Sequence, residues 1–260
     1  MKNTDLIFGL MASLGKEEYT IADLLYLVRP FQVSETSLRT NLSRMSQRKW
    51  VQSRRQGKTV FYRFSPKGQS ISVNVAKSFR TQDWTGWNDT WWGVLFSVPE
   101  LQKEARYRIR VKLASYRFAP LYAGTWIRPF HEAENMETYL QNIASNPHCT
   151  MIRFQCMNPI TKKDSIRLWK LADIHREFKE ALTILSQSRR TLVKLTPERA
   201  FVEGMHTSSR IVDILFMDPL LPDCFLPPGW KGRELKQRFK EYNRVVKNQS
   251  KPFWMKIFEE

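Results

Sequence analysis

The residues from Ser34 to Arg63, SETSLRTNLSRMSQRKWVQSRRQGKTVFYR, decide the fold that the sequence predicts. The residue type at Ser34 commonly caps the start of a helix. The apolar positions that follow recur at the spacing of one helical face: Leu38, Leu42 and Met45. The alternating aromatic and β-branched residues after them favour two short strands joined at Gly57. The stretch therefore predicts a capped helix followed at once by a β-hairpin.

Two further helices are expected before this stretch. The first begins at Asn3 and is stopped by Gly15, and the second is capped by Thr20 and ends before Pro30. Helix, helix, tight turn and helix is the order of a helix-turn-helix motif. With the hairpin added, residues 1–80 are predicted to form a winged helix-turn-helix domain that binds DNA.

The outward face of the helix after Ser34 carries hydroxyl groups and arginines. Steps of 100° per residue from Leu38 place on this face and its flanks Thr36, Ser37, Arg39, Thr40, Ser43, Arg44 and Arg48, and the hairpin tip adds Arg54, Arg55 and Lys58. Residues 34–63 contain eight bases and one acid, Glu35, a local net charge of +7. Arginine can read guanine in the major groove, and hydroxyls can bond phosphate oxygens. We predict that these residues contact DNA.

The composition of the whole chain agrees with a polyanionic partner. The 260 residues carry a formal net charge of +17, and 42% of them are apolar, enough for a buried core. No apolar run is long enough to span a membrane, and the first residues do not read as a signal peptide. The three cysteines show no CxxC spacing, which favours a reducing cytoplasm and argues against a disulfide framework or zinc ribbon.

Residues 81–160 are predicted to form a ferredoxin-like domain. A buried strand follows the tryptophan-rich segment 84–92, and Pro99 with Glu100 opens a helix. Residues 106–113 also alternate as a strand would, and we favour the helix because its apolar stripe is longer. The remaining expected elements are strands at 117–122 and 124–128, a helix at 134–144 and a strand at 150–157. This strand-helix-strand-strand-helix-strand order is ferredoxin-like.

Residues 161–260 are predicted to be helical. After a charged turn at 161–164, one amphipathic helix includes Leu171 to Leu185. Two shorter helices are expected at Pro197–Met205 and Ser208–Phe216, and a last one from Arg233 to about Lys247. The predicted fold class is therefore α+β, with an N-terminal winged helix-turn-helix (1–80), a central ferredoxin-like domain (81–160) and a helical C-terminal domain (161–260).

Several motifs resemble the PaaX family, bacterial repressors of phenylacetate degradation. In the first domain these are Arg39-Thr40, Ser43-Arg44, Trp50, Gly57-Lys58 and Tyr62, although Lys49 stands where the family usually has glycine. Later matches are Trp84–Trp87, Val98–Glu100, Gly124–Pro129, Asp218–Gly232, and Phe239 with Tyr242. The resemblance implies a central ferredoxin-like domain similar to a CRISPR-associated nuclease. It also implies a regulator released by an acyl-coenzyme A, of which phenylacetyl-coenzyme A is the best-known example.

Some features of the sequence allow functions other than DNA binding. The tryptophans at 84–92 can stack bases, but packing at a junction between domains is the favoured interpretation. A metal site using His148, Cys149 and Cys156 has weak support, and no catalytic motif is evident. The alternatives are an RNA-binding protein or nuclease built on the ferredoxin-like domain, and an enzyme acting on acyl-coenzyme A thioesters.

The sequence thus predicts a cytoplasmic transcriptional regulator rather than an enzyme, and the family resemblance implies a repressor. Its expected partner is a double-stranded DNA operator, which it binds as a homodimer, because two heads on one side of the duplex give the needed affinity. No metal, cofactor or membrane is expected. The effector is expected to be an acyl-coenzyme A, and its binding residues are not identified.

Overall fold

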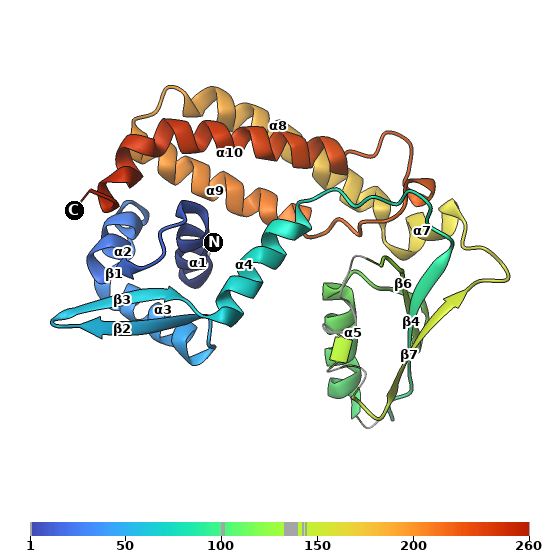
Figure 1. Ribbon diagram of the computed structural model, residues 1–260. Coiled ribbons are helices and arrows are strands. Elements are labelled where there is room, and N and C mark those ends of the chain that lie inside the picture. Colours follow the sequence, from blue (N-terminus) through green and yellow to red (C-terminus); the bar gives the residue numbers. More distant parts are fainter. Residues whose placement is uncertain (1, 100–101, 133–139, 142, 144, 260) are drawn as a thin grey trace. The chain divides into compact units, whose positions relative to one another are not determined.

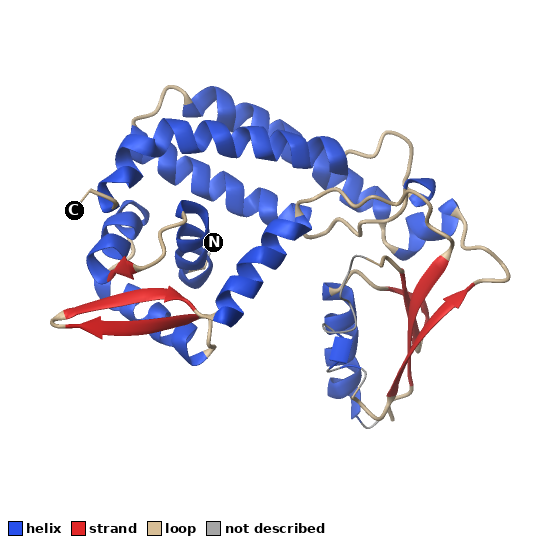
Figure 2. Ribbon diagram, in the orientation of Figure 1, coloured by secondary structure: helices blue, strands red, loops and turns tan. Residues whose placement is uncertain are grey.

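The fold is a mixture of helices and antiparallel strands, as the computed structural model shows (Figures 1 and 2). The structure describes residues 2–99, 102–132, 140–141, 143 and 145–259. They form two compact units, and neither unit is continuous in sequence. The first unit combines Met1–Arg80, Glu180–Leu215 and Glu234–Glu260, and the second combines Thr81–Lys179 and Phe216–Arg233.

The N-terminal part of the first unit has the element order of a winged helix-turn-helix. Its helices and strands, in chain order, are α1 (Asn3–Leu14), β1 (Tyr19–Thr20), α2 (Ile21–Val28), the 3₁₀ helix η1 (Arg29–Phe31), α3 (Glu35–Gln47), β2 (Val51–Gln56), β3 (Thr59–Phe64) and α4 (Pro66–Ser78). The strands form an antiparallel sheet in the order β1-β3-β2. The predicted helices and hairpin are confirmed.

Local signals set the ends of these elements. Gly15 ends α1 with φ of 72°, and Thr20 and Asp23 form a reciprocal capping box at α2. Pairing of Gln56 with Thr59 leaves a two-residue hairpin turn, in which Gly57 has φ of 58°. Each of these features depends on residues that are close in sequence, so the pattern alone could predict it.

The backbone at Lys49 is also left-handed, with φ of 58°. Its amide donates to the Ser46 carbonyl at 2.9 Å as the chain turns from α3 into β2. A side chain is strained in this conformation and glycine is not. This left-handed backbone explains why the PaaX family usually has glycine at this position. In the present chain Lys49 adopts the same conformation with some strain.

The core of the first unit joins the N-terminal helices to the C-terminal end of the chain. Leu24, Leu38 and Leu42 are fully buried in one cluster, and this cluster also contains Phe201, Phe253, Trp254 and Ile257. The Tyr26 ring stacks on Phe253 with centroids 4.9 Å apart, and its hydroxyl donates to the Phe253 carbonyl. The segment around Phe253 therefore completes the core of the N-terminal domain.

The C-terminal helices are α8 (Leu171–Leu192), α9 (Pro197–Leu215) and α10 (Gly232–Trp254), followed by the 3₁₀ helix η4 (Met255–Ile257). The prediction of two helices within 197–216 was wrong, because α9 is continuous. The hydroxyl of Thr207 lies at the expected break, 3.1 Å from Glu203 and 3.2 Å from Ser188. Ser188 in turn donates to Glu203 and meets the Tyr242 hydroxyl at 2.7 Å. The polar residues at the expected break therefore bind neighbouring helices instead of ending α9.

The last helix is longer than predicted, since α10 reaches Trp254 instead of ending near Lys247. Pro252 lies within its last turn, where proline normally disfavours a helix. Phe253 and Trp254 are buried in the core cluster of the first unit. Burial of two large aromatic side chains offsets the local cost of the proline.

The second unit contains a four-stranded antiparallel sheet. Its elements are β4 (Thr90–Phe96), α5 (Lys103–Ser115), β5 (Ala119–Tyr122), β6 (Thr125–Pro129), β7 (Cys149–Gln155), α7 (Lys162–Leu168) and the 3₁₀ helix η3 (Asp223–Phe225). The strand order β5-β6-β4-β7, with α5 connecting β4 to β5 along the chain, is consistent with a ferredoxin-like fold. The turn expected at 161–164 is the start of a helix instead: Thr161 caps α7 through a capping box with Asp164, and residues 162–164 belong to α7.

The helix predicted after Pro99 is confirmed as α5, which begins at Lys103 and buries Ile109 and Leu113 against the sheet. The helix predicted at 134–144 falls largely outside the described residues. Of its residues, Leu140, Gln141 and Ile143 are described and are helical, and Leu140 and Ile143 belong to the same core as α5. Among the described residues, no helix combines the length and apolar character needed to cross a bilayer.

Candidate nucleic-acid interface

The orientation of α3 is fixed by burial of one face. Leu38, Leu42 and Met45 are almost completely buried, and the Ser34 hydroxyl accepts from the amide of Ser37 at the start of the helix. The opposite face is therefore turned to solvent. Of the predicted contact residues associated with α3, those that are exposed are Thr36, Arg39, Thr40, Ser43, Arg44 and Arg48.

Ser37 differs from the other predicted contact residues. Its side chain is half-buried, and its hydroxyl accepts from the amide of Asn3 at 3.0 Å. Asn41, one turn later, donates to the Ser37 carbonyl and accepts from the hydroxyl of Thr4. These bonds attach α3 to the start of α1. Sequence reasoning missed Asn41, and the available signal was its position beside the buried stripe of Leu38 and Leu42.

Two arginines near α3 already have partners. Arg39 donates from Nε and Nη2 to the carboxylate of Glu35, one helical turn earlier, at 2.8 and 2.7 Å. The guanidinium of Arg48 lies over the Trp50 ring, 5.2 Å from its centroid. Arg44 makes no ion pair with any described residue. Arg44 is therefore the arginine on the outer face of α3 that is most available to an incoming partner.

The hairpin separates its basic residues. Arg54 and Arg55 are neighbours in β2, so their side chains point to opposite faces of the sheet. Arg55 donates to the carbonyl of Gly57, whereas Arg54 lies over the Phe61 ring and pairs with Glu18 at 2.7 Å. Lys58, in the turn, makes no ion pair among the described residues. The structure therefore places the two arginines on different surfaces of the hairpin.

The Glu18–Arg54 pair changes the ionisation of both groups. Hydrogen bonding to Arg54 holds the pKa of Glu18 below its ordinary value, and the nearby charges of Arg54 and Arg63 act in the same direction. The same hydrogen bond raises the pKa of Arg54. Both side chains are therefore charged over the whole physiological pH range. Among the described residues, Glu18 and Glu35 are the acids that pair with the predicted DNA-binding arginines.

Comparison with known proteins covers this interface and most of the remaining chain. The family model described as "PaaX-like protein" matches residues 4–68. The "PaaX protein central Cas2-like domain" matches residues 85–166, and the "PaaX-like protein C-terminal domain" matches residues 168–256. Three successive models of one family thus follow each other along the chain. The chain belongs to the PaaX family.

Two individual proteins are similar to this PaaX-family chain over most of its length. The Transcriptional repressor PaaX of Escherichia coli (strain K12) is 25% identical over 250 residues, which is 89% of this chain and 75% of that protein. The structure of Uncharacterized protein Rv0674 from Mycobacterium tuberculosis has a TM-score of 0.61 at 20% identity and covers 96% of each chain. The second likeness concerns the fold alone.

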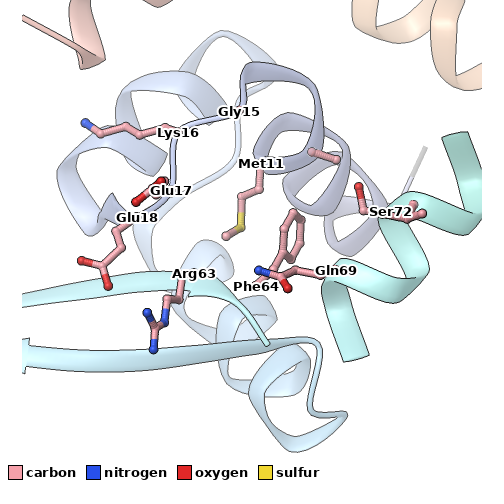
Figure 3. Close-up of a pocket in the computed structure, with 11 residues that line it drawn as sticks. Met11, Gly15, Lys16, Glu17, Glu18, Arg63, Phe64, Gln69 and Ser72 are labelled. Atoms are coloured by element: carbon pink, nitrogen blue, oxygen red, sulfur yellow. The ribbon is translucent and has the colours of Figure 1, made fainter. Parts of the chain in front are cut away.

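A pocket of about 660 Å³ lies beside the hairpin of this PaaX-family chain (Figure 3). Met11 and Phe64 give it an apolar floor. Glu18 and Arg63 line one end, and Gln69 lies on the side of α4. Its polar lining contains both acids and bases, so its charge favours neither an anion nor a cation.

The tryptophan-rich segment, residues 84–92, packs inside the second unit. Trp91 and Trp92, at 1% and 5% exposure, are buried in β4. Trp91 lies against Trp169 and Phe225, with ring centroids 6.4 and 5.3 Å apart. Burial leaves neither Trp91 nor Trp92 a free ring face for stacking bases. Trp169 and Phe225 belong to the second unit, whereas the sequence favoured packing at a junction with the N-terminal domain.

Among the described residues, no group of three or more histidine, cysteine and acidic side chains is placed to hold a metal ion. Burial raises the pKa of Cys149 and Cys156, which keeps both thiols protonated. His131 Nε2 lies 2.7 Å from the Asp83 carbonyl, so this ring nitrogen already has a backbone partner.

Proposed function

We propose that this PaaX-family chain is a transcriptional repressor that binds a double-stranded DNA operator through α3 and the β2–β3 hairpin. The observation that carries the proposal is the two-sided character of α3. Its apolar face is buried in the core, and its outer face presents Arg44 among exposed hydroxyls. The name of the Escherichia coli relative, Transcriptional repressor PaaX, supports repression as the output.

The predicted contacts that lie on α3 and in the hairpin turn differ in their roles in this proposal. Thr40 and Arg44 face the major groove, where arginine reads guanine and a hydroxyl bonds base edges or phosphate. Thr36, Ser43 and Arg48 lie around them and contact the backbone. Ser37, which is already bonded to α1, orients the helix more than it contacts DNA. Lys58 contacts the flanking phosphates from the hairpin.

We propose further that the chain acts in the cytoplasm as a homodimer. One N-terminal domain offers only α3 and the β2–β3 hairpin to DNA, which is a small surface for a specific protein–DNA interface. Two heads related by a twofold axis read two half-sites on one side of the duplex. Analytical ultracentrifugation tests this, with the mass of a dimer expected for the free protein and for its complex with one operator.

The effector that we propose is an acyl-coenzyme A, with phenylacetyl-coenzyme A as the first compound to test. The proposal rests on the family resemblance. A ligand that binds only the folded state raises the melting temperature, so a thermal-shift series checks it. Free coenzyme A and free phenylacetate are the controls. Stabilisation by the thioester alone, with release of bound DNA, is the expected result.

The alternative of an RNA-binding protein or nuclease is not favoured, because the central tryptophans Trp91 and Trp92 are buried. The decisive experiment compares promoter duplex with single-stranded RNA over a range of salt. With roughly 6–10 phosphate contacts, duplex affinity should fall about 10³–10⁵-fold from about 50 to 200 mM salt. A salt-independent affinity, or a preference for the RNA, would contradict the proposal.

A further inference from the structure

The Arg54 guanidinium is bonded by two side chains of its own chain. Its Nη2 donates to Glu18 Oε2 at 2.7 Å, its Nε lies 3.4 Å from Glu18 Oε1, and its Nη1 donates to Gln56 at 2.8 Å. Each nitrogen of the guanidinium therefore faces a side-chain oxygen. A carboxylate on the Nε and Nη2 edge occupies the position that a phosphate takes in a bidentate arginine–phosphate contact.

Glu18 is held in place by its neighbours in sequence. Lys16 pairs with Asp23 at 3.1 Å and donates to the backbone carbonyl of Ile257. Tyr19 is buried, pairs with Tyr62 across the sheet and donates its hydroxyl to the Met11 carbonyl. Because Lys16 and Tyr19 are anchored, the backbone around Glu18 is ordered before its carboxylate binds Arg54.

The pair also differs from the other acid–arginine pair of the interface. Glu35 and Arg39 are one turn apart in α3, so they meet wherever this helix forms. Glu18 and Arg54 are 36 residues apart and meet only in the folded domain. Arg54 is folded over the Phe61 ring toward Glu18, with 48% of its side chain still exposed. Solvent and an incoming anion therefore reach the guanidinium.

We infer that Glu18 competes with DNA phosphate for Arg54 and thereby weakens the grip of the hairpin on any duplex. The inference rests on the proposed DNA binding. A phosphate contact to Arg54 requires the Glu18 carboxylate to leave, so part of the contact energy is lost to breaking the pair. Phosphate contacts carry no base information, and the competition therefore lowers non-specific affinity while the contacts of Arg44 are unchanged.

The experiment compares Glu18→Gln with Glu17→Gln. Both substitutions remove one negative charge from the same loop and keep the side-chain shape. Glu17 is exposed and has no ion pair among the described residues, so it is the matched control for net charge. Affinity for a fluorescently labelled duplex of mixed sequence is measured across a salt series, and melting temperatures confirm that both variants fold.

Glu18→Gln is expected to bind the duplex about 1.5- to 5-fold more tightly than Glu17→Gln, the range typical of an exposed ion pair. Its log affinity should also fall more steeply with log salt, by about 0.9 for each additional phosphate contact. Arg54→Gln should abolish the difference between the two variants. Equal affinities for both variants, weaker binding by Glu18→Gln, or a gain that survives Arg54→Gln would overturn the inference.

The design separates this inference from the proposed function. If the unsubstituted chain and Glu17→Gln bind duplex DNA in a salt-dependent way, the proposed function stands whatever Glu18→Gln does. If neither binds, the proposed function fails first, and the competition at Arg54 fails with it.

Discussion

Replacing Lys58 by alanine should remove a phosphate contact without disturbing the fold. Lys58 lies in the two-residue hairpin turn and makes no ion pair among the described residues. Each phosphate contact adds about 0.9 to the slope of log affinity against log salt. Over a rise from about 50 to 200 mM salt, one contact fewer reduces the salt-induced loss of affinity by about 3.5-fold, and two contacts in a homodimer reduce it by about 12-fold.

Arg44→Ala should behave differently, because Arg44 is exposed at the centre of the outer face of α3. Loss of an arginine that reads a base costs about 1–3 kcal/mol at the specific site and relaxes the preference for sequence at that position. On a duplex of mixed sequence, Arg44→Ala should lose only the part of the binding affinity that the arginine charge contributes. Lys58→Ala should weaken binding to both duplexes alike.

Fluorescence-anisotropy titrations with a promoter duplex and a mixed-sequence duplex, each at several salt concentrations, measure both effects. Lys194→Ala, which removes an exposed cation between α8 and α9, is the control and should leave the salt slope unchanged. Equal losses for Arg44→Ala and Lys58→Ala on both duplexes would refute the division between base reading and backbone contact. An unchanged slope for Lys58→Ala would refute its phosphate contact.

Three further predictions concern the framework of the N-terminal domain. Lys49→Gly should raise the free energy of unfolding by about 0.5–1 kcal/mol in chemical denaturation, because glycine relieves the left-handed backbone. Gly68→Ala should lower it by about 1–3 kcal/mol or prevent folding, because the added carbon would lie 1.9 Å from the Trp50 carbonyl oxygen, and a normal stability would contradict this contact. Burial raises the pKa of Tyr19 to about 12. The Tyr19 phenol therefore stabilises the fold below pH 10, its ordinary pKa, and loses this effect as pH rises toward 12. By about pH 11, denaturation should show that the unsubstituted chain has lost about 1.4 kcal/mol more than Tyr19→Phe.

Much of the candidate interface could be predicted from sequence because its determinants are local. The buried stripe from Leu38 to Met45 identifies the outer face of α3 by helical geometry alone. Ser34 and Gly57 set the start of the helix and the turn of the hairpin. The family resemblance added the order of the domains, and three family matches along the chain confirm the family.

The roles of individual side chains within the interface required the tertiary structure. Ser37 was predicted as a contact residue, yet its hydroxyl is bonded to Asn3 in another helix. Arg54 and Arg55 were predicted to act together, yet they face opposite sides of β2 and only Arg54 meets Glu18. These partners are more than 30 residues apart in sequence. A local periodic pattern does not show which residue, distant in sequence, will contact a given side chain in the folded protein.

By itself, therefore, the sequence determined the α+β class, the helix-turn-helix with its hairpin and the basic outer face of α3. These features follow from caps, turns and side-chain spacing within a few residues. Only the tertiary structure decided that α9 is continuous and that Phe253 and Trp254 complete the N-terminal core. The tertiary structure also decided that Glu18 forms an ion pair with Arg54. Burial and ion pairing between distant segments depend on which surfaces meet in the folded chain. Where these tertiary contacts contribute more free energy than local helix or turn propensity, they decide the structure.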